Sequence, residues 1–190
     1  MTKEEFKKYF WSIKDRTVGI YDFQYQDIEF IDFVGYAHCH TGWDNLKDLI
    51  DWKGKKVVDL GGFHGYYSIK IKEAGAEKAL AVNHVKEVND TTQLLNDSIG
   101  NPIEVGFWES KDPVPQGYEV ALLLNALHHM PDQELTVKNL TYYKQVIFEV
   151  NPPQQELIEK YFNVIKTKVS HHNPAQINRV ILLCEPKISE

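Results

Sequence analysis

A glycine-rich turn after a short apolar run is the part of the sequence that most directly indicates chemistry. The run Val57-Val58-Asp59-Leu60 is followed by Gly61, Gly62, Phe63 and, two residues on, Gly65. Glycines permit positive φ angles and a close approach of the backbone to a ligand. If the segment is a strand, a turn and then a helix, backbone N–H groups face a ligand lying over the carboxyl end of the strand. The turn therefore predicts a ligand site, although purely structural turns of similar composition are common.

A second polar segment follows the apolar run Val120 to Asn125 and reads Ala126-Leu127-His128-His129-Met130-Pro131-Asp132. Together the two segments resemble class I S-adenosylmethionine-dependent methyltransferases. Asp59, Gly61 and Gly65 match the acidic residue and two glycines of motif I, and the run from Glu119 to Asp132 resembles the fourth-strand motif of the small-molecule branch. The resemblance covers residues 52 to 150, and the expected strands through Pro186 agree with it.

The resemblance implies S-adenosylmethionine as cofactor. Phe63 stands at the position of the middle glycine in the family's motif I. Asn83 stands where the family usually has an acidic residue that accepts hydrogen bonds from both ribose hydroxyls of the cofactor. A neutral amide can still bind a diol, more weakly than a carboxylate does. Trp108 lies in a region that often flanks the adenine of the cofactor in the family. Its ring is suited either to stacking on the adenine or to packing in the core. The cofactor-binding residues implied are Asp59, Gly61, Gly62, Phe63, Gly65, Asn83, His84, Trp108 and Asn125.

The paired histidines after the fourth apolar run are the catalytic candidates. Methyl transfer needs an aligned nucleophile and a dry pocket, and a base of near-neutral pKa assists a hydroxyl, amine or thiol acceptor. A histidine at the carboxyl edge of the sheet suits that role. His128 matches the position of a catalytic histidine in plant-type O-methyltransferases, with His129 second. The alternative is that both histidines only pack.

Three other segments invite functional interpretations that their spacing disfavours. His38-Cys39-His40 would place two histidines on one face of a strand, leaving further zinc ligands to come from His64 or Cys184, so no metal site is predicted. Asn151-Pro152-Pro153 resembles an amino-methyltransferase motif but follows the fifth strand and lacks the final aromatic residue. Its prolines are expected to end a strand and begin a helix. His171 to Pro174 is expected to be a turn.

The elements that position these residues follow a βαβ pattern, with short apolar runs between helix-length polar stretches. The pattern predicts a Rossmann-like, doubly wound α/β sheet of seven strands, mostly parallel, with an antiparallel C-terminal edge strand. A helix is expected over Gln154 to Tyr161. The expected strands are Lys56 to Leu60, Lys78 to Asn83, Pro102 to Phe107, Val120 to Asn125, Gln145 to Val150, Asn163 to Val169 and Arg179 to Cys184.

Residues 1–53 differ from the rest and are predicted to form an N-terminal extension or lid over a core of residues 54–190. Aromatic and acidic residues alternate here, which allows some irregular strand or hairpin, and apolar spacing predicts a short helix starting near Thr41. Because the core has no long insertion, this extension is the expected wall for the acceptor. Its aromatic residues either line a pocket or fill the interface with the sheet: Tyr21, Tyr25, Tyr36 and Trp43.

Composition limits the remaining choices. With 190 residues, of which 43% are hydrophobic and 25% charged, the chain is the size of one globular domain. Its 27 acidic residues outnumber its 21 basic residues, giving a net charge of -6, so a general nucleic-acid binder is disfavoured though not excluded. Two distant cysteines favour a reducing, cytoplasmic setting, and no apolar run approaches the roughly 20 residues that span a bilayer.

The sequence thus predicts a methyltransferase that acts on a small-molecule acceptor. Four alternatives stay open: an enzyme that uses S-adenosylmethionine without transferring its methyl group, a tRNA-modifying methyltransferase, a degenerate module that binds the cofactor without catalysis, and an NAD-dependent enzyme. The degenerate module is credible because of Phe63 and Asn83. The NAD-dependent enzyme is less favoured because G-x-G-x-x-G is not formed.

Overall fold

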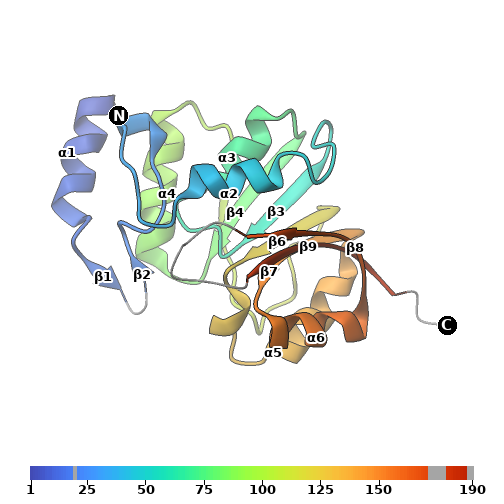
Figure 1. The fold of residues 1–190 in the computed structure, drawn as a ribbon. Coiled ribbons are helices and arrows are strands. Elements are labelled where there is room, and N and C mark those ends of the chain that lie inside the picture. Colours follow the sequence, from blue (N-terminus) through green and yellow to red (C-terminus); the bar gives the residue numbers. More distant parts are fainter. Residues whose placement is uncertain (19–20, 171–178, 188–190) are drawn as a thin grey trace.

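A seven-stranded sheet forms the centre of the computed structural model, which describes residues 1–18, 21–170 and 179–187 (Figure 1). The strand order is β5-β4-β3-β6-β7-β9-β8. The strands are β3 (Lys56–Leu60), β4 (Lys78–Asn83), β5 (Glu104–Phe107), β6 (Val120–Leu124), β7 (Gln145–Val150), β8 (Phe162–Val169) and β9 (Val180–Pro186).

The pairing confirms the predicted doubly wound sheet. Neighbours from β5 through β7 are parallel, and β9 pairs antiparallel with both β7 and β8. The antiparallel strand is therefore β9, one position inside the edge strand β8. Observed strand ends differ from the predicted ones by at most two residues, as at β5, which begins at Glu104 and leaves Pro102 outside the ladder. Proline has no N–H to donate to a neighbouring strand.

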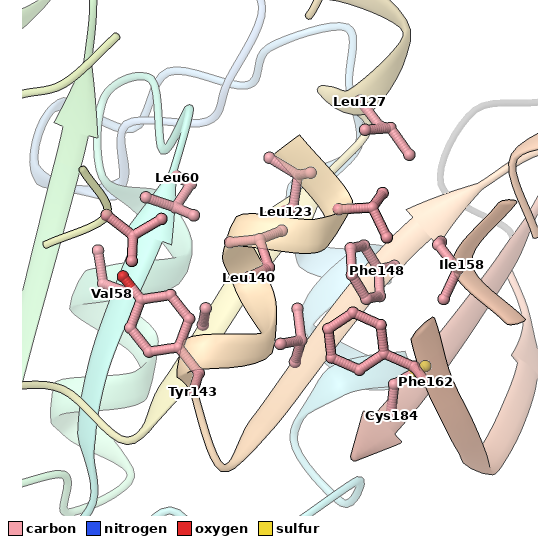
Figure 2. Packing of buried hydrophobic residues seen from close by; sticks show 14 of the residues in the cluster. Val58, Leu60, Leu123, Leu127, Leu140, Tyr143, Phe148, Ile158, Phe162 and Cys184 are labelled. Atoms are coloured by element: carbon pink, nitrogen blue, oxygen red, sulfur yellow. The ribbon is translucent and has the colours of Figure 1, made fainter. Parts of the chain in front are cut away.

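One face of the sheet packs against α5 (Gln133–Asn139) and α6 (Pro152–Tyr161), which lie together below the sheet in Figure 1. Strand side chains alternate between faces, so Val58 and Leu60 point to this side. Figure 2 shows them with Leu140 and Tyr143, from the 3-10 turn Leu140–Tyr142 and the residue after it, and with Phe148 and Ile158. This core holds the strands whose ends carry the candidate site.

The opposite face is covered by α2 (Cys39–Leu46), α3 (Tyr66–Glu73) and α4 (Lys86–Ser98). Val57, Leu122 and Ile147 on the strands pack against Leu46 and Ile71 of these helices. Helices on both faces are what a mostly parallel sheet requires, because its strands are apolar on both sides.

The interpretation of Asn151-Pro152-Pro153 as a helix start is confirmed. Asn151 is the N-cap of α6: its side chain accepts from the Gln154 N–H, and the Gln154 side chain accepts from the Asn151 N–H. The two prolines occupy the first positions of the helix, where an N–H has no intrahelical acceptor. The predicted turn at residues 171–174 lies outside the described residues.

The N-terminal segment contains a helix that was not predicted, α1 (Lys3–Ile13). Thr2 and Glu5 form a capping box at its start. Phe6 and Phe10 are fully buried in a cluster that includes Val88 and Leu95 of α4. Two short strands, β1 (Thr17–Val18) and β2 (Tyr21–Asp22), pair antiparallel. Of the irregular strand expected from Tyr21 to Phe33, the structure has only β2 and a bridge between Ile28 and Phe33 around a 3-10 turn, Glu29–Ile31. The extension thus packs on the core, and its separation at residue 53 stays a prediction.

Across the described ranges, no helix combines the length and the apolar character needed to cross a membrane.

Candidate functional site

A cavity of about 500 Å³ opens at the carboxyl ends of the central strands. Its walls are the loops after β3, β4, β5 and β6, together with the N-terminal segment. From β3 the chain adds β4 and β5 on one side and β6 and β7 on the other, so the strand order reverses at β3. Ligands of open α/β sheets bind at this reversal point.

The glycine turn after β3 forms one wall. Gly61 (φ +78°), Phe63 (φ +52°) and Gly65 (φ +79°) all adopt the left-handed region. The N–H groups of Gly61 and Gly62 donate to the Val82 carbonyl at 2.9 and 3.2 Å. A Cβ atom on Gly61 would lie 3.3 Å from Cβ of Ala126, which is on the opposite loop. The absence of a side chain at Gly61 therefore keeps open the space between the two loops.

Asn83, at the end of β4, is bound to the backbone of this turn. Its Oδ1 accepts from the Phe63 N–H at 3.1 Å, and its Nδ2 donates to the Phe63 carbonyl at 3.0 Å. Thr92 Oγ1 donates to the same carbonyl at 2.8 Å. Asn83 is only 2% exposed. Because both ends of its amide are engaged, Asn83 holds Phe63 in its left-handed conformation, and the next residue, His84, is the exposed one on the cavity wall.

The N-terminal segment closes the start of α3. Gln26 Oε1 accepts from the N–H groups of His64 and Tyr66 at 3.0 and 3.4 Å. His64 is buried, its Nε2 lies 3.1 Å from the Phe23 carbonyl, and burial lowers its pKa to about 4. Helix N-termini are common phosphate sites. Here the side chain of Gln26 accepts from two such donors, the N–H groups of His64 and Tyr66.

Asp59 lies beneath the turn and does not line the large cavity. It is 2% exposed, and Ser68 Oγ donates to its Oδ2 at 3.3 Å. Burial raises the pKa of its carboxyl to about 7, against the lowering effect of the Ser68 hydrogen bond. A Cβ atom on Gly62 would approach Asp59 Oδ2 to 2.8 Å. Asp59 and Gly62 instead line a smaller cavity of about 20 Å³, the size of a single water molecule.

The opposite wall of the large cavity carries the histidines. His128 and His129 belong to the 3-10 turn Leu127–His129, are exposed, and have ring centroids 3.7 Å apart. Partial burial, followed by the charges of His129 and Arg179, lowers the pKa of His128 to about 4. Burial also lowers the pKa of His129. At neutral pH the His128 imidazole is therefore uncharged, and it is a weaker base than an unperturbed histidine.

Two further cavity residues carry polar atoms without partners. Trp108 is 5% exposed, and its buried Nε1 has no hydrogen-bond partner among the described residues. The same holds for Oδ1 of Asn125, whose Nδ2 donates to the Tyr25 hydroxyl at 2.7 Å. Buried polar atoms are nearly always hydrogen-bonded. Two residues of the cavity wall thus each contain one buried polar atom without a partner among the described residues.

No protein-family model and no curated protein sequence matches the chain. Solved structures do. PH0226 protein from Pyrococcus horikoshii matches with 13% identity and a TM-score of 0.69, over 95% of this chain and 99% of that chain. Magnesium protoporphyrin IX methyltransferase from Synechocystis, with bound S-adenosylhomocysteine (SAH), matches with 13% identity and a TM-score of 0.67, over 97% and 100%. The [4+2]-cyclase SpnF matches with 10% identity and a TM-score of 0.65, over 87% of each chain.

The chain has the class I methyltransferase fold. The resemblance drawn from the glycine turn and the fourth strand is confirmed at the level of the fold. A cyclase also has this fold, so the reaction must be argued from the site.

Within this methyltransferase fold, most of the residues predicted from sequence meet at the large cavity: Gly61, Phe63, Asn83, His84, Trp108, Asn125, His128 and His129. Gly65 lines neither cavity. It is the N-cap of α3, and a Cβ there would lie 2.9 Å from Cδ1 of Ile103, so packing requires glycine. The roles assigned to these residues stay predictions.

The N-terminal segment contributes Asp22, Tyr25 and Tyr36 to the wall. Tyr25 and Tyr36 are thus among the aromatic residues that line the pocket, whereas Trp43 packs near Trp52, with ring centroids 6.1 Å apart. The side chain of Tyr21 lies outside the described part of the structure. Asp22, Glu109 and Ser110 were not predicted, because isolated polar loop residues carry no motif.

The strand interpretation of His38-Cys39-His40 is wrong. His38 adopts a left-handed conformation (φ +49°) and is the N-cap of α2, so the two histidines do not alternate along a strand. Cys39 and Cys184 are buried on opposite faces of the sheet. The ranges that the structure describes contain no group of three or more His, Cys, Asp or Glu side chains placed to hold a metal.

Proposed function

We propose that the chain is an S-adenosylmethionine-dependent methyltransferase that acts on a small molecule. The observation that carries this proposal is the cavity at the reversal point of the sheet, with the glycine turn on one wall and a neutral histidine on the other. Its volume of about 500 Å³ lies within the range of small-molecule and cofactor sites.

The chemistry of the walls favours a nucleoside cofactor without phosphate groups. Two N–H donors at the start of α3, those of His64 and Tyr66, are taken by Gln26 and so are not available to a phosphate. Gly61 leaves room for close approach, His84 adjoins the turn, and the ring of Trp108 offers an aromatic face with an unpaired Nε1. We assign cofactor binding to these three residues. When bound, the cofactor supplies a methyl group activated by its sulfonium.

We assign the role of general base to His128. Its imidazole is neutral at pH 7, so a ring nitrogen can take a proton from an acceptor hydroxyl, amine or thiol placed in the cavity, although the lowered pKa makes it a weaker base than an ordinary histidine. Tyr25 and Tyr36 supply an aromatic wall near it. A net charge of -6 favours a small molecule over a nucleic acid as acceptor.

Calorimetry with SAH tests the cofactor assignment, and release of SAH from S-adenosylmethionine tests transfer. We expect SAH to bind, Trp108→Leu to weaken binding, and Tyr142→Leu, at an exposed aromatic residue away from the cavity, to leave it unchanged. An acceptor panel should then yield SAH only when the acceptor is present.

A second function, a degenerate cofactor-binding module without transfer, is favoured by Asn83, whose amide is engaged by Phe63 at a position where the resemblance implies an acidic residue. Binding of SAH with no acceptor-dependent release across the panel would support this second function. Failure of the chain to bind SAH would contradict both.

A further inference from the structure

Arg179 lies at the carboxyl-end edge of the sheet, beside strands whose loops line the cavity, and is not itself a lining residue. It precedes β9, and the pairing of Val180 with Val150 places it just beyond the carboxyl end of β7. The neighbouring strand, β6, leads into the loop that carries Asn125 and His128. The sheet therefore brings Arg179 to the histidine side of the cavity, away from β4 and β5 on the cofactor side.

One nitrogen of the Arg179 guanidinium is buried without a partner among the described residues. Its Nη1 has no solvent contact and no hydrogen bond within the described residues. Glu149, a buried carboxylate on the neighbouring strand β7, accepts through Oε1 from the Ser170 hydroxyl at 2.6 Å. No ion pair joins Arg179 to a described carboxylate. A guanidinium without a counterion is costly to bury.

The charge of Arg179 acts on the cavity itself. The pKa of His128 is lowered first by partial burial, then by His129 and then by the charge of Arg179. The charge of Arg179 also lowers the pKa of His129, after burial. It further opposes the rise that burial causes in the pKa of Tyr25. Three residues that line the cavity therefore lie within range of this cation, which a bound anion would complement.

We infer that the acceptor is an anion whose carboxylate or phosphate group is bound by Arg179, with its nucleophilic atom toward His128. That the anion is the methyl acceptor rests on the proposed function. The anion site itself can be tested without catalysis. Arginine binds carboxylates and phosphates alike through paired N–H donors. What the two groups share is an oxyanion that accepts both donors, planar in a carboxylate and tetrahedral in a phosphate.

The test uses the full chain and three probes that share a phenyl ring: the planar anion benzoate, the tetrahedral anion phenyl phosphate, and benzamide, the neutral analogue of benzoate. Binding is followed through the imidazole NMR signals of His128 and His129, with and without saturating SAH. We expect one of the anions to bind about tenfold more tightly than benzamide, because a charged hydrogen-bonded pair replaces a neutral contact. Whichever anion binds more tightly identifies the group.

Variants then assign the preference to Arg179. Arg179→Gln should abolish it and Arg179→Lys should retain part of it. Arg16→Gln, at the only other arginine of the chain and an exposed one, should leave it intact. Equal binding of anion and amide, absence of anion binding at millimolar concentration, or an unchanged preference in folded Arg179→Gln would overturn the inference. If SAH fails to bind, the proposed function fails, while the probes still decide the anion site.

Discussion

The glycine turn and the histidine loop face each other across one cavity, but they are held in different ways. The turn is buried, and side chains of Asn83, Thr92 and Gln26 bind its backbone at both N–H and carbonyl groups. The histidine loop is exposed, and the side-chain contact that joins it to the N-terminal segment is the Asn125–Tyr25 hydrogen bond. The wall proposed for the cofactor is thus fixed through its backbone, whereas the wall proposed for the acceptor is made of replaceable side chains.

This difference suggests a division of work. A wall fixed by buried hydrogen bonds presents one shape and suits a constant ligand, the cofactor. An exposed loop whose side chains determine the chemistry can change specificity without disturbing the core. Perturbing the turn should therefore reduce stability and cofactor affinity together, while changes in the loop should affect turnover or acceptor binding alone.

The largest effect on stability is expected for Asn83→Ala. The variant removes two hydrogen bonds from a buried segment and leaves the Phe63 N–H unpaired, so the free energy of unfolding should fall by about 3 kcal/mol. Denaturant unfolding measures this loss, and calorimetry should show weaker SAH binding. The matched control is Asn163→Ala, at an exposed asparagine of β8, with an expected loss under about 0.5 kcal/mol. Equal losses in the two variants would show that the turn is not held by Asn83.

His128→Ala should act on turnover alone, lowering it about a hundredfold if the imidazole is the base. SAH affinity and unfolding should stay near those of the wild type, because the residue is exposed. His38→Asn is the control, since His38 lies outside the cavity and asparagine tolerates its left-handed conformation. Turnover that survives in His128→Ala would reduce this histidine to a packing role.

The pH dependence of turnover follows from the same residue. The pKa of His128 is lowered to about 4, so its imidazole is neutral above that value and becomes protonated below it. Activity that depends on this base should persist as pH falls through 6.5, the usual value for histidine, and should be lost only near pH 4. An NMR titration of the His128 ring measures the pKa directly. A midpoint near 6.5 would contradict the electrostatic description of the loop.

Gly61→Ala should lower SAH affinity about tenfold, a smaller change than that expected at His128. The new Cβ lies 3.3 Å from Ala126 Cβ, in the space between the two walls, and the φ angle of +78° adds backbone strain. Gly117→Ala separates the two causes: it has a φ of +86° and open space around the position. Both variants should lose about 1 kcal/mol of stability, but SAH affinity should fall in Gly61→Ala alone. A similar loss of affinity in both would remove Gly61 from the cavity wall.

The sequence predicts the sheet well because its signals are local. Apolar runs mark the five parallel strands, and Asn151 with two prolines marks the start of α6. The missed helix α1 also had local signals, a Thr2–Glu5 capping box and apolar residues Phe6 and Phe10 four apart. His38 was misjudged because one left-handed residue turned an apparent strand into a helix start.

The site is harder to predict because its decisive contacts join distant residues. The sequence places Asn83 at the cavity, but its amide is taken by Phe63, twenty residues earlier. Tyr25 and Asn125 are one hundred residues apart. Asp59 matches a motif yet lies beneath the turn, because strand alternation directs it to the face opposite Val58 and Leu60. Spacing identifies which residues reach an edge of the sheet, and tertiary hydrogen bonds determine which of them stay available.

The smallest expected effect probes the contact between the extension and the histidine loop. Tyr25→Phe removes the hydroxyl that accepts from Asn125 Nδ2, a hydrogen bond worth about 1 kcal/mol of stability. Tyr36→Phe is the control on the same wall, since Tyr36 is 49% exposed and its hydroxyl forms no hydrogen bond within the described chain. Denaturant unfolding should show a loss for Tyr25→Phe and under about 0.5 kcal/mol for Tyr36→Phe. Because the glycine turn does not depend on this contact, SAH affinity should remain near wild type in both, whereas a fall in Tyr25→Phe alone would mean that the two walls are coupled through Asn125.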